Sequence, residues 1–194
     1  MLKSSRAALL GASAFVAVLS LGVSFNSPSF AEKTVEVGGA AMFPSKNIVE
    51  NAVNSKDHTT LVAAVKAAGL VDTLSSKGPF TVFAPTNGAF EKLPKETVPT
   101  LLKPENKDKL TGILTYHVVA GKMSAEEIAM KAKEAGGKLE LKTVAGGKLV
   151  LMSDDKGAWW VADEAGNKAK ITIADVFQSN GVIHVIDTVM LPKS

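Results

Sequence analysis

Three histidines are the residues of this chain best suited to acid–base or metal chemistry: His58, His117 and His184. Asp57 precedes the first and Asp187 follows the third, and an aspartate beside an imidazole can orient it as the base of a hydrolase. The chain has no Gly-x-Ser-x-Gly sequence, the elbow that presents a nucleophilic serine. We therefore expect a protein that is not an enzyme, and we expect Asp57 to cap a helix.

The same histidines are poorly spaced for a metal centre. They lie far apart in the chain, with no His-x-His or His-x-x-x-His pair, and the chain contains no cysteine. Soft thiolate ligands are therefore absent, and a metal site would need residues that converge only in the fold. The sequence predicts no metal site and no cofactor.

Residues 1–31 have the pattern of a Sec-type signal peptide. Lys3 and Arg6 precede an apolar segment, and Ser29-Phe-Ala31 places small residues at the two positions that a signal peptidase reads. The alternative is a membrane anchor, but the apolar run is short against the ~20 residues of a membrane-spanning helix and rich in small residues. We expect cleavage after Ala31 and a secreted or periplasmic protein without a stable membrane anchor.

Removal of this leader changes the charge balance of the chain. The whole sequence has 22 basic and 19 acidic residues. The leader holds two basic residues and no acidic one, so 20 basic face 19 acidic residues in the mature chain, a net charge of +1. Arg6 is the only arginine, and bidentate recognition of phosphate depends on the guanidinium group. Nucleic-acid binding is not expected.

Helical spacing predominates in the first half of the chain and strand alternation in the second. Apolar residues recur at helical spacing in 48–53, 61–68 and 110–114. Ser124 and Glu127 form a capping box for a further helix. Strands are expected over 149–152, 158–162, 169–173 and 182–191. Helices followed by antiparallel strands predict an α+β fold, with a flexible lead-in over 32–43 and one domain over 44–192, because roughly 160 residues form a single core.

Two separated segments are predicted to be buried strands bounded by turns or helix starts. The first runs from Thr81 to Phe90: Pro85 ends its strand because proline donates no ladder hydrogen bond, and a helix follows. Its structural residues are Thr81, Phe83, Pro85, the helix cap Thr86 or Asn87, and the buried Phe90.

The second segment begins with an Asn180-Gly181 turn and continues as a strand to Asp187. Successive residues of a strand alternate between its faces, so His184 shares a largely apolar face with Val182 and Ile186. We expect His184 to be a neutral core residue with hydrogen-bond partners. A ligand or pH-sensing role is the alternative.

A third segment, Thr115-Tyr-His-Val-Val119, lies between these two and is predicted to be a strand. In this order the three segments closely resemble the two signature boxes and the Tyr-His box of the fasciclin domain, over about Asn47 to Pro192. The resemblance implies a fasciclin-type β-sandwich wedge of antiparallel strands with helices packed along it. It also implies an adhesion or interaction module, without a shared catalytic site, that binds a protein or a surface glycan.

The resemblance also points to residues for partner binding. The Tyr-His box is linked to cell adhesion in animal members of the family, although its flanking aliphatic residues can equally be core. An Asp-aliphatic pair of another adhesion segment matches here, whereas the two positions before it do not. Adjacent tryptophans on a predicted strand point to opposite faces, so one can be exposed. The candidate contact residues are Tyr116, His117, Asp175, Val176, Trp159 and Trp160.

A second function belongs to another class. Some fasciclin-domain proteins bind carotenoids, and a wedge flanked by helices could open a groove for an apolar small molecule such as a carotenoid or lipid. Side chains such as Ile171, Val176 and Trp160 would line that groove. The sequence leaves the interaction module and the carrier as alternatives.

Overall fold

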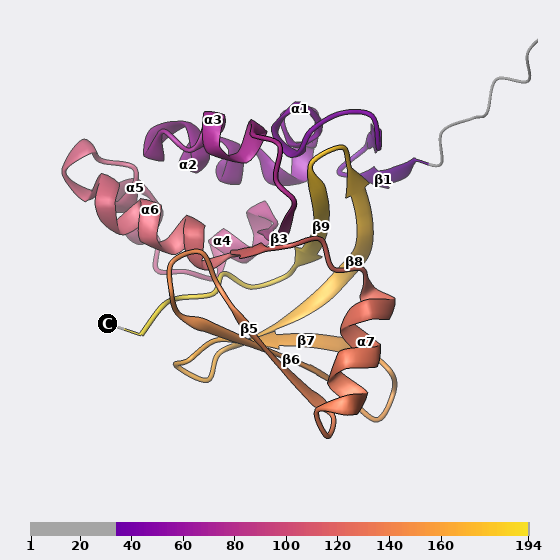
Figure 1. The fold of residues 1–194 in the computed structure, drawn as a ribbon. Coiled ribbons are helices and arrows are strands. Elements are labelled where there is room, and N and C mark those ends of the chain that lie inside the picture. The colour runs from indigo at the N-terminus through magenta and orange to yellow at the C-terminus, as the bar shows by residue number, and fades with distance from the viewer. Residues whose placement is uncertain (1–33, 194) are drawn as a thin grey trace, which may run out of the picture. The chain divides into compact units, whose positions relative to one another are not determined.

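A seven-stranded sheet organises residues 34–193, the part of the chain that this computed structural model describes (Figure 1). The predicted signal peptide and its cleavage site lie outside these residues. The strand order is β4-β3-β9-β8-β7-β6-β5, and every neighbouring pair is antiparallel except β3 and β9. The strands are β3 (Phe80–Pro85), β4 (Val118–Ala120), β5 (Lys138–Lys142), β6 (Lys148–Ser153), β7 (Trp159–Ala162), β8 (Lys168–Gln178) and β9 (Gly181–Ile186).

Helices cover one part of this sheet more than the other. In Figure 1, α1 to α6 gather around β3 and β9, while α7 lies beside β5, β6 and β7. The α-helices are α1 (Ile48–Ala52), α2 (Thr59–Ala68), α3 (Val71–Ser75), α4 (Asn87–Glu91), α5 (Thr97–Leu101), α6 (Lys107–Tyr116) and α7 (Ala125–Glu134), and two 3₁₀ turns are η1 (Lys56–His58) and η2 (Pro104–Asn106). The mixture of helices with a mostly antiparallel sheet confirms the α+β prediction. Among residues 34–193, no helix has the length and apolar content needed to cross a bilayer.

Two apolar cores lie on opposite faces of the central strands. Val82 and Val185 contribute to a core shared with helices α1 to α6. Phe83 and Ile186 contribute to a second core, with inward residues of β5 to β8 and with Ile128 of α7. The alternation expected for these strands therefore holds, and each of them serves both cores.

The segment expected to be a flexible lead-in without regular structure instead contains a β-hairpin. Strands β1 (Val35–Val37) and β2 (Ala40–Met42) pair through a turn whose two residues, Gly38 and Gly39, have φ of 60° and 74°. Two positive φ angles in a two-residue loop suit the right-handed twist of a hairpin, and glycine adopts them without strain. Val37 and Met42 are buried in the first core. Three residues per strand give too short a pattern to be recognised in the sequence.

The predicted strand over 115–119 is wrong in its first half. Helix α6 continues to Tyr116, His117 ends it, and only Val118–Ala120 is a strand. Thr115 donates from Oγ1 to the carbonyl of Thr111 at 2.7 Å, a bond within the helix. The helical spacing that starts at Leu110 therefore outweighs the strand preference of these residues.

Gly181 is packed so tightly that we expect a methyl group there to destabilise the fold. A Cβ at Gly181 would lie 2.2 Å from the carbonyl oxygen of Phe80, and overpacking of this kind costs ~1–3 kcal/mol or more. Gly181→Ala should lower the free energy of unfolding measured in urea by at least that amount.

Gly112 offers a matched control for this substitution. It lies within α6, and a Cβ there would meet no atom within 4 Å. Gly112→Ala should raise stability by ~0.5–1 kcal/mol, because alanine favours the helix. Equal stability of the two variants would contradict the packing that the structure shows around Gly181.

Candidate functional site

Tyr116, a candidate contact residue, is fully buried at the end of α6. Its hydroxyl donates to the carbonyl of Lys148 at 2.7 Å and accepts from the backbone N–H of Glu164 at 3.1 Å. Burial raises the pKa of the phenol, so it stays protonated and keeps its donor. This side chain joins α6 to the start of β6 and to the loop after β7.

His117 is buried beside it, with 3% of its surface exposed. Nε2 accepts from the backbone N–H of Met190 at 3.0 Å, so the ring proton is on Nδ1, which donates to the carbonyl of Ile113 at 2.8 Å. Burial lowers the pKa of His117 to about 4. In the folded domain the Tyr-His pair is therefore internal, and a partner could not contact it without opening the core.

His184, in the second box, lies within strand β9 and is also fully buried. Its Nδ1 accepts from the N–H of Asp175 at 3.3 Å, so Nε2 donates to the carbonyl of Met123 at 3.0 Å. The ring stacks on Phe83 with 5.7 Å between ring centroids. Burial lowers the pKa of His184, which keeps it neutral. It is a core residue with both nitrogens bonded, as the strand pattern predicts.

The two residues of the candidate pair have different environments: Asp175 lies in a bulge of β8, and Val176 lies in the first core. Asp175 has φ of 57° where the register of β8 against β9 shifts, and its carboxylate accepts from the N–H of Ala125 at 2.7 Å. Ala125 is the first residue of α7, where a carboxylate stabilises the helix N-terminus. Val176 is buried in the first core. Asp175 alone of this pair remains accessible, and it is half-buried.

The two tryptophans lie on opposite faces of β7, as adjacent strand residues should. Trp159 packs against the second core and lines a cleft of about 190 Å³ beside α7, which we call the α7 cleft. Trp160 is on the other face, where its Nε1 donates to Asp154 at 3.1 Å. Both side chains are half-buried. The α7 cleft is lined by Ala125, Ile128, Gly157, Ala158, Trp159, Ile171, Thr172, Ala174 and His184.

This cleft differs from the groove expected for an apolar ligand. Ile171 lines it as predicted. Val176 instead faces the first core and Trp160 the outer face of the sheet, because β8 changes register between Ile173 and Val176 and because β7 alternates.

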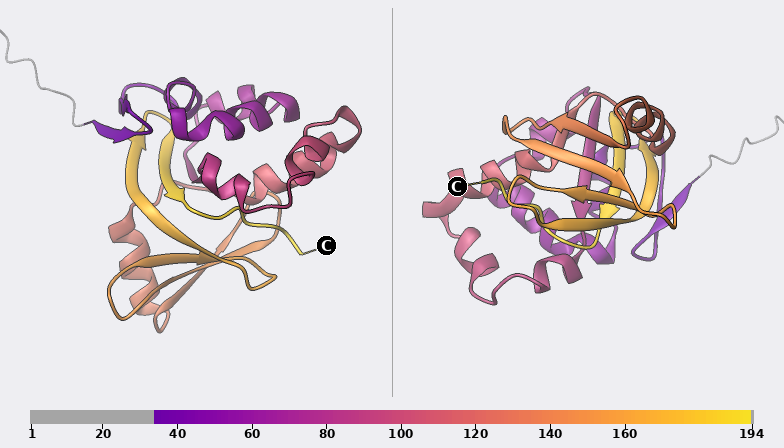
Figure 2. Two further views of the ribbon diagram at one scale, coloured as in Figure 1. Left: turned by 180° about the vertical axis from the view of Figure 1, so that it is seen from behind. Right: turned by 90° about the horizontal axis from the view of Figure 1, so that it is seen from below.

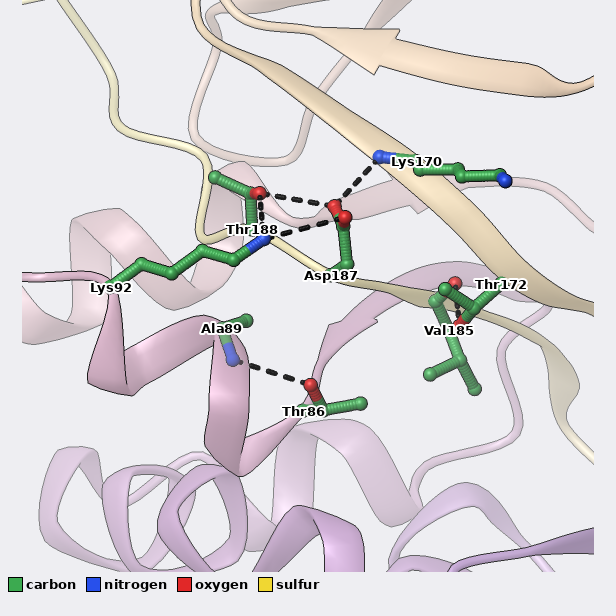
Figure 3. Close-up of polar contacts among 8 residues, drawn as sticks. All are labelled: Thr86, Ala89, Lys92, Lys170, Thr172, Val185, Asp187 and Thr188. Carbon is green, nitrogen blue, oxygen red and sulfur yellow. Dashed lines mark hydrogen bonds and ion pairs between the residues drawn. The ribbon is translucent and has the colours of Figure 1, made fainter.

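Thr81 and Thr86 of the first box use their hydroxyls to fix local structure. The Thr81 hydroxyl donates to Gly121 at 2.7 Å and accepts from the N–H of Met123 at 3.0 Å. Thr86 caps α4 by accepting from the N–H of Ala89 at 3.3 Å (Figure 3). The strand before it ends at Pro85, as predicted, while Phe90, expected to be buried, is only half-buried.

Asn87 caps a different helix from its own. Its Oδ1 accepts from the N–H of Thr60 at 3.0 Å and from the hydroxyl of Thr59 at 3.2 Å, both in the first turn of α2. Its Nδ2 donates to the carbonyl of Lys56 at 2.8 Å. The sequence predicts a capping residue but gives no sign that the helix it caps lies 27 residues away.

Asn180 joins the helices to the sheet. Its Oδ1 accepts from the N–H of Ile48 at 3.0 Å, and its Nδ2 donates to the carbonyls of Leu74 and Ser76 at 2.7 and 2.8 Å. The side chain is buried with every polar atom bonded. Asn180, which the sequence predicts as a turn residue, therefore also holds the helices α1 and α3 against the sheet.

Asp187 lies where β8, β9 and α4 meet (Figure 3). Its Oδ1 accepts from the N–H of Lys170 at 2.8 Å and the hydroxyl of Thr188 at 3.0 Å, and its Oδ2 pairs with Lys92 at 3.3 Å. Burial alone would raise the pKa of this carboxyl, but these bonds outweigh it and the pKa is lowered. Asp187 is not bonded to His184, so the hydrolase pairing does not form.

A serine–histidine contact that the sequence did not indicate occurs at Ser55 and His58. The Ser55 hydroxyl lies 2.9 Å from Nδ1 of His58, and both residues are buried. Asp57 is exposed at the surface and makes no hydrogen bond to this ring. His58 lines an apolar cavity of about 60 Å³, and burial lowers its pKa, although the backbone of Ala84 and the charge of Asp57 act in the opposite direction.

Within residues 34–193 no three metal-ligating side chains come together. Residues 56–192 match the family model of the Fasciclin domain. The chain belongs to the fasciclin domain family. Members of this family are generally adhesion or interaction modules.

The similar proteins cover most of this domain. Protein sll1483 of Synechocystis sp. (strain ATCC 27184 / PCC 6803 / Kazusa) is 50% identical over 161 residues, which is 83% of this chain and 82% of that one. Cell surface glycolipoprotein MPB83 of Mycobacterium bovis (strain BCG / Tokyo 172 / ATCC 35737 / TMC 1019) is 36% identical over 163 residues, 81% of this chain and 64% of that one. A FAS1 domain pair from the insect cell adhesion molecule fasciclin I has the same fold, with a TM-score of 0.69 at 18% identity, over 83% of this chain and 58% of that chain.

Neutral His117 makes the stability of this fasciclin domain depend on pH. The pKa falls from an ordinary 6.5 to about 4 in the folded protein, so the unfolded chain takes up a proton first. The contribution of neutral His117 to the free energy of unfolding is fully present above pH 6.5. As the pH falls to 4, the free energy of unfolding decreases by ~3 kcal/mol. Urea unfolding at pH 7 and at pH 4 should show that loss.

The variant His117→Gln separates this contribution from those of other groups. It should be less stable than the wild type at pH 7, because a buried hydrogen-bond pair is disturbed. Its free energy of unfolding should nevertheless change by ~3 kcal/mol less between pH 7 and pH 4. The same pH dependence in both proteins would show that His117 does not titrate as its burial requires.

Proposed function

We propose that this protein is a non-catalytic adhesion or interaction module that works outside the cytoplasm and binds another protein or a surface glycan. The pattern of residues 1–31 supports export, as does the relative named as a cell surface glycolipoprotein. The similar solved fold comes from a cell adhesion molecule. The folded domain would present its partner with the side chains that its own core leaves free.

The observation that carries this proposal is how the chemically versatile groups are used. The polar atoms of three such side chains form hydrogen bonds within the domain, and most of these bonds join segments that are distant in the sequence. The side chains are His117, His184 and Asp187. Catalysis needs such groups to be poised next to a substrate. Here the same groups are hydrogen-bonded within the domain, so they are not free to act on a substrate. This favours a protein that functions by binding a partner at its surface.

Three of the six candidate contact residues remain accessible, on two sides of the sheet: Trp160 lies on the outer face, and Trp159 and Asp175 lie beside α7. Tyr116, His117 and Val176 are buried, whereas Trp159, Trp160 and Asp175 are half-buried on β7 and on the bulge of β8. Partly exposed tryptophan is typical of contact surfaces, because it offers a large apolar area and a polar N–H group. The outer face with Trp160 is the surface through which we expect a partner to bind.

The carrier function is supported less well by the cavities described. The apolar cavity beside His58 measures about 60 Å³ and the α7 cleft about 190 Å³, whereas sites for drug-sized ligands span ~300–1,000 Å³. A larger groove of about 850 Å³ beside α5 and α6 includes Glu96, Thr100 and Lys109 in its lining. Apolar side chains line it too, among them Leu101, Ile113 and Leu191, so the groove has a mixed character. A pigment or a lipid tail would have to bind next to its charged groups, which is unfavourable unless they remain hydrated.

A binding assay with matched variants tests the proposed function. The protein, produced with its own leader and isolated in its processed form, is labelled and applied to envelopes and extracellular material of its source. We expect saturable retention, and a loss of at least about tenfold in affinity for Trp160→Ala, since a tryptophan central to an interface is commonly worth ~2 kcal/mol. Val53→Ala, at an exposed apolar residue on α1's end, should bind as the wild type does.

Two results would contradict this proposal. Wild-type protein that is retained by none of these materials would remove the interaction function. A purified protein that absorbs visible light, or carries a few hundred daltons of extractable mass, would establish the carrier function instead. Thermal unfolding of each variant distinguishes lost contact from lost fold.

A further inference from the structure

The outer face of strands β5 to β8 has a small apolar centre, and we call this surface the open sheet face. Residues directly opposite each other in antiparallel strands share a face. Trp160 pairs with Met152 on one side and with Lys170 on the other. Val150, two residues before Met152 on the same strand, continues the centre. All three apolar side chains are half-buried, so they form a shallow surface without protruding.

The apolar side chains of this face belong to neither of the two apolar cores within residues 34–193. The alternate residues of the same strands, such as Leu149, Leu151 and Val161, point into the second core. Helix α7 packs on that inner side too, because its Ile128 and Ala132 belong to the domain interior. The right view of Figure 2 looks at these strands from below, with helices α1 to α6 behind them.

Around the apolar centre the open sheet face is strongly basic. The same pairing that places Trp160 outward also places five lysines and one glutamate outward, all of them exposed. They are Lys138, Glu140, Lys142, Lys148, Lys168 and Lys170. Five positive charges less one negative charge leave +4 on this face, whereas the mature chain as a whole carries only +1 by the count given above.

Few of these charges are neutralised within the domain. Among residues 34–193, Lys148 is the one lysine of this set that lies within ion-pair distance of a carboxylate, 3.2 Å from Glu140. Three carboxylates border the face. Asp154 accepts the Trp160 N–H and interacts electrostatically with Lys170, Glu164 accepts from the backbone N–H of Lys148, and Asp187 is paired with Lys92. The five lysines of the face still outnumber its own glutamate and the two unpaired carboxylates at its border. A positive field therefore remains over the face, and it attracts a polyanion.

The chemistry of the face selects among polyanions. Lysine is a point charge that can meet a carboxylate or sulfate from any direction, whereas bidentate recognition of phosphate depends on the planar guanidinium group of arginine, which the face lacks. Insertion into a bilayer requires apolar side chains that protrude from the surface. The apolar side chains of this face, Val150, Met152 and Trp160, are half-buried, so an anionic membrane is a less suitable partner. A tryptophan ring fixed by Asp154 offers a flat apolar surface to the C–H face of a sugar.

We propose that the open sheet face binds an acidic polysaccharide, with Trp160 stacked on a sugar ring and the lysines paired with its carboxylate or sulfate groups. The row from Lys138 to Lys170 crosses three strand spacings, ~14 Å, which is long enough to contact several sugars in succession. This inference rests on the proposed interaction function and assigns it a surface and a class of partner.

Charge-matched triple variants test the role of the lysines. Binding of processed protein to polygalacturonate, with dextran as the uncharged control, is measured by calorimetry over a series of salt concentrations. The face variant carries Lys138→Gln, Lys168→Gln and Lys170→Gln. The control variant carries Lys77→Gln, Lys95→Gln and Lys103→Gln, which are exposed lysines outside the face, so both proteins have the same net charge.

We expect the wild type and the control variant to bind polygalacturonate with similar affinity and not to bind dextran. The face variant should bind at least tenfold more weakly. The slope of log affinity against log salt should become shallower by about two, because fewer counterions are released when fewer lysines pair. Equal weakening of both triple variants would overturn the proposal, since net charge and not this face would then govern binding.

Tryptophan fluorescence tests the stacking separately. The chain has two tryptophans, so Trp159→Phe leaves Trp160 as the only reporter and Trp160→Phe leaves Trp159. Emission from Trp160 should shift or be quenched when an oligogalacturonate binds, and emission from Trp159, in the α7 cleft, should not. A response from Trp159 alone would move the site to the cleft and overturn the assignment.

The outcomes separate this inference from the proposed function. If the protein is retained by envelopes but binds no acidic polysaccharide, the interaction function stands and this partner class is wrong. Tight binding to phosphatidylglycerol vesicles or to duplex DNA with none to polygalacturonate would replace the polysaccharide by another polyanion. Retention by neither envelopes nor polysaccharide would contradict both proposals.

Discussion

Hydrogen bonds from two adjacent side chains, Tyr116 and His117, hold together segments that lie far apart in the sequence. The phenol bonds the backbone at Lys148 and Glu164, and the imidazole bonds it at Met190. A buried backbone group that lost such a partner would cost ~1–3 kcal/mol, so these bonds are strongly required. The end of α6, the start of β6, the loop after β7 and the C-terminal segment are thereby fixed relative to one another.

The sequence predicts those parts of the fold that depend on local patterns. The capping box at Ser124 and the alternation of β9 are local, and both are present. The strand proposed at Tyr116 failed because the helix begun at Leu110 persists past residues with strand preference. The bonds of Asn87 and Asn180 depend on which segments meet in space, and no periodicity carries that information.

The same distinction applies to the candidate site. Alternation correctly divided Trp159 and Trp160 between two faces, but it could not show that Tyr116, His117 and Val176 face the cores. Burial in this domain follows from the register shift in β8 and from the position of α6 against the sheet. Polar groups suited to chemistry are thus used to build the fold, and what remains for recognition is the outward side of the strands.

Tyr116 links the interior to that outward side. Its hydroxyl holds the carbonyl of Lys148 at the start of β6, and a Cβ at Gly147 would lie 2.6 Å from its ring. It also holds Glu164 in the loop that leads to β8. A slip of one residue in either hairpin would turn the lysines and Trp160 inward and expose leucines. By pinning both turns, one buried phenol determines which side chains the open sheet face presents, so a residue that never touches a partner can still decide what the partner meets.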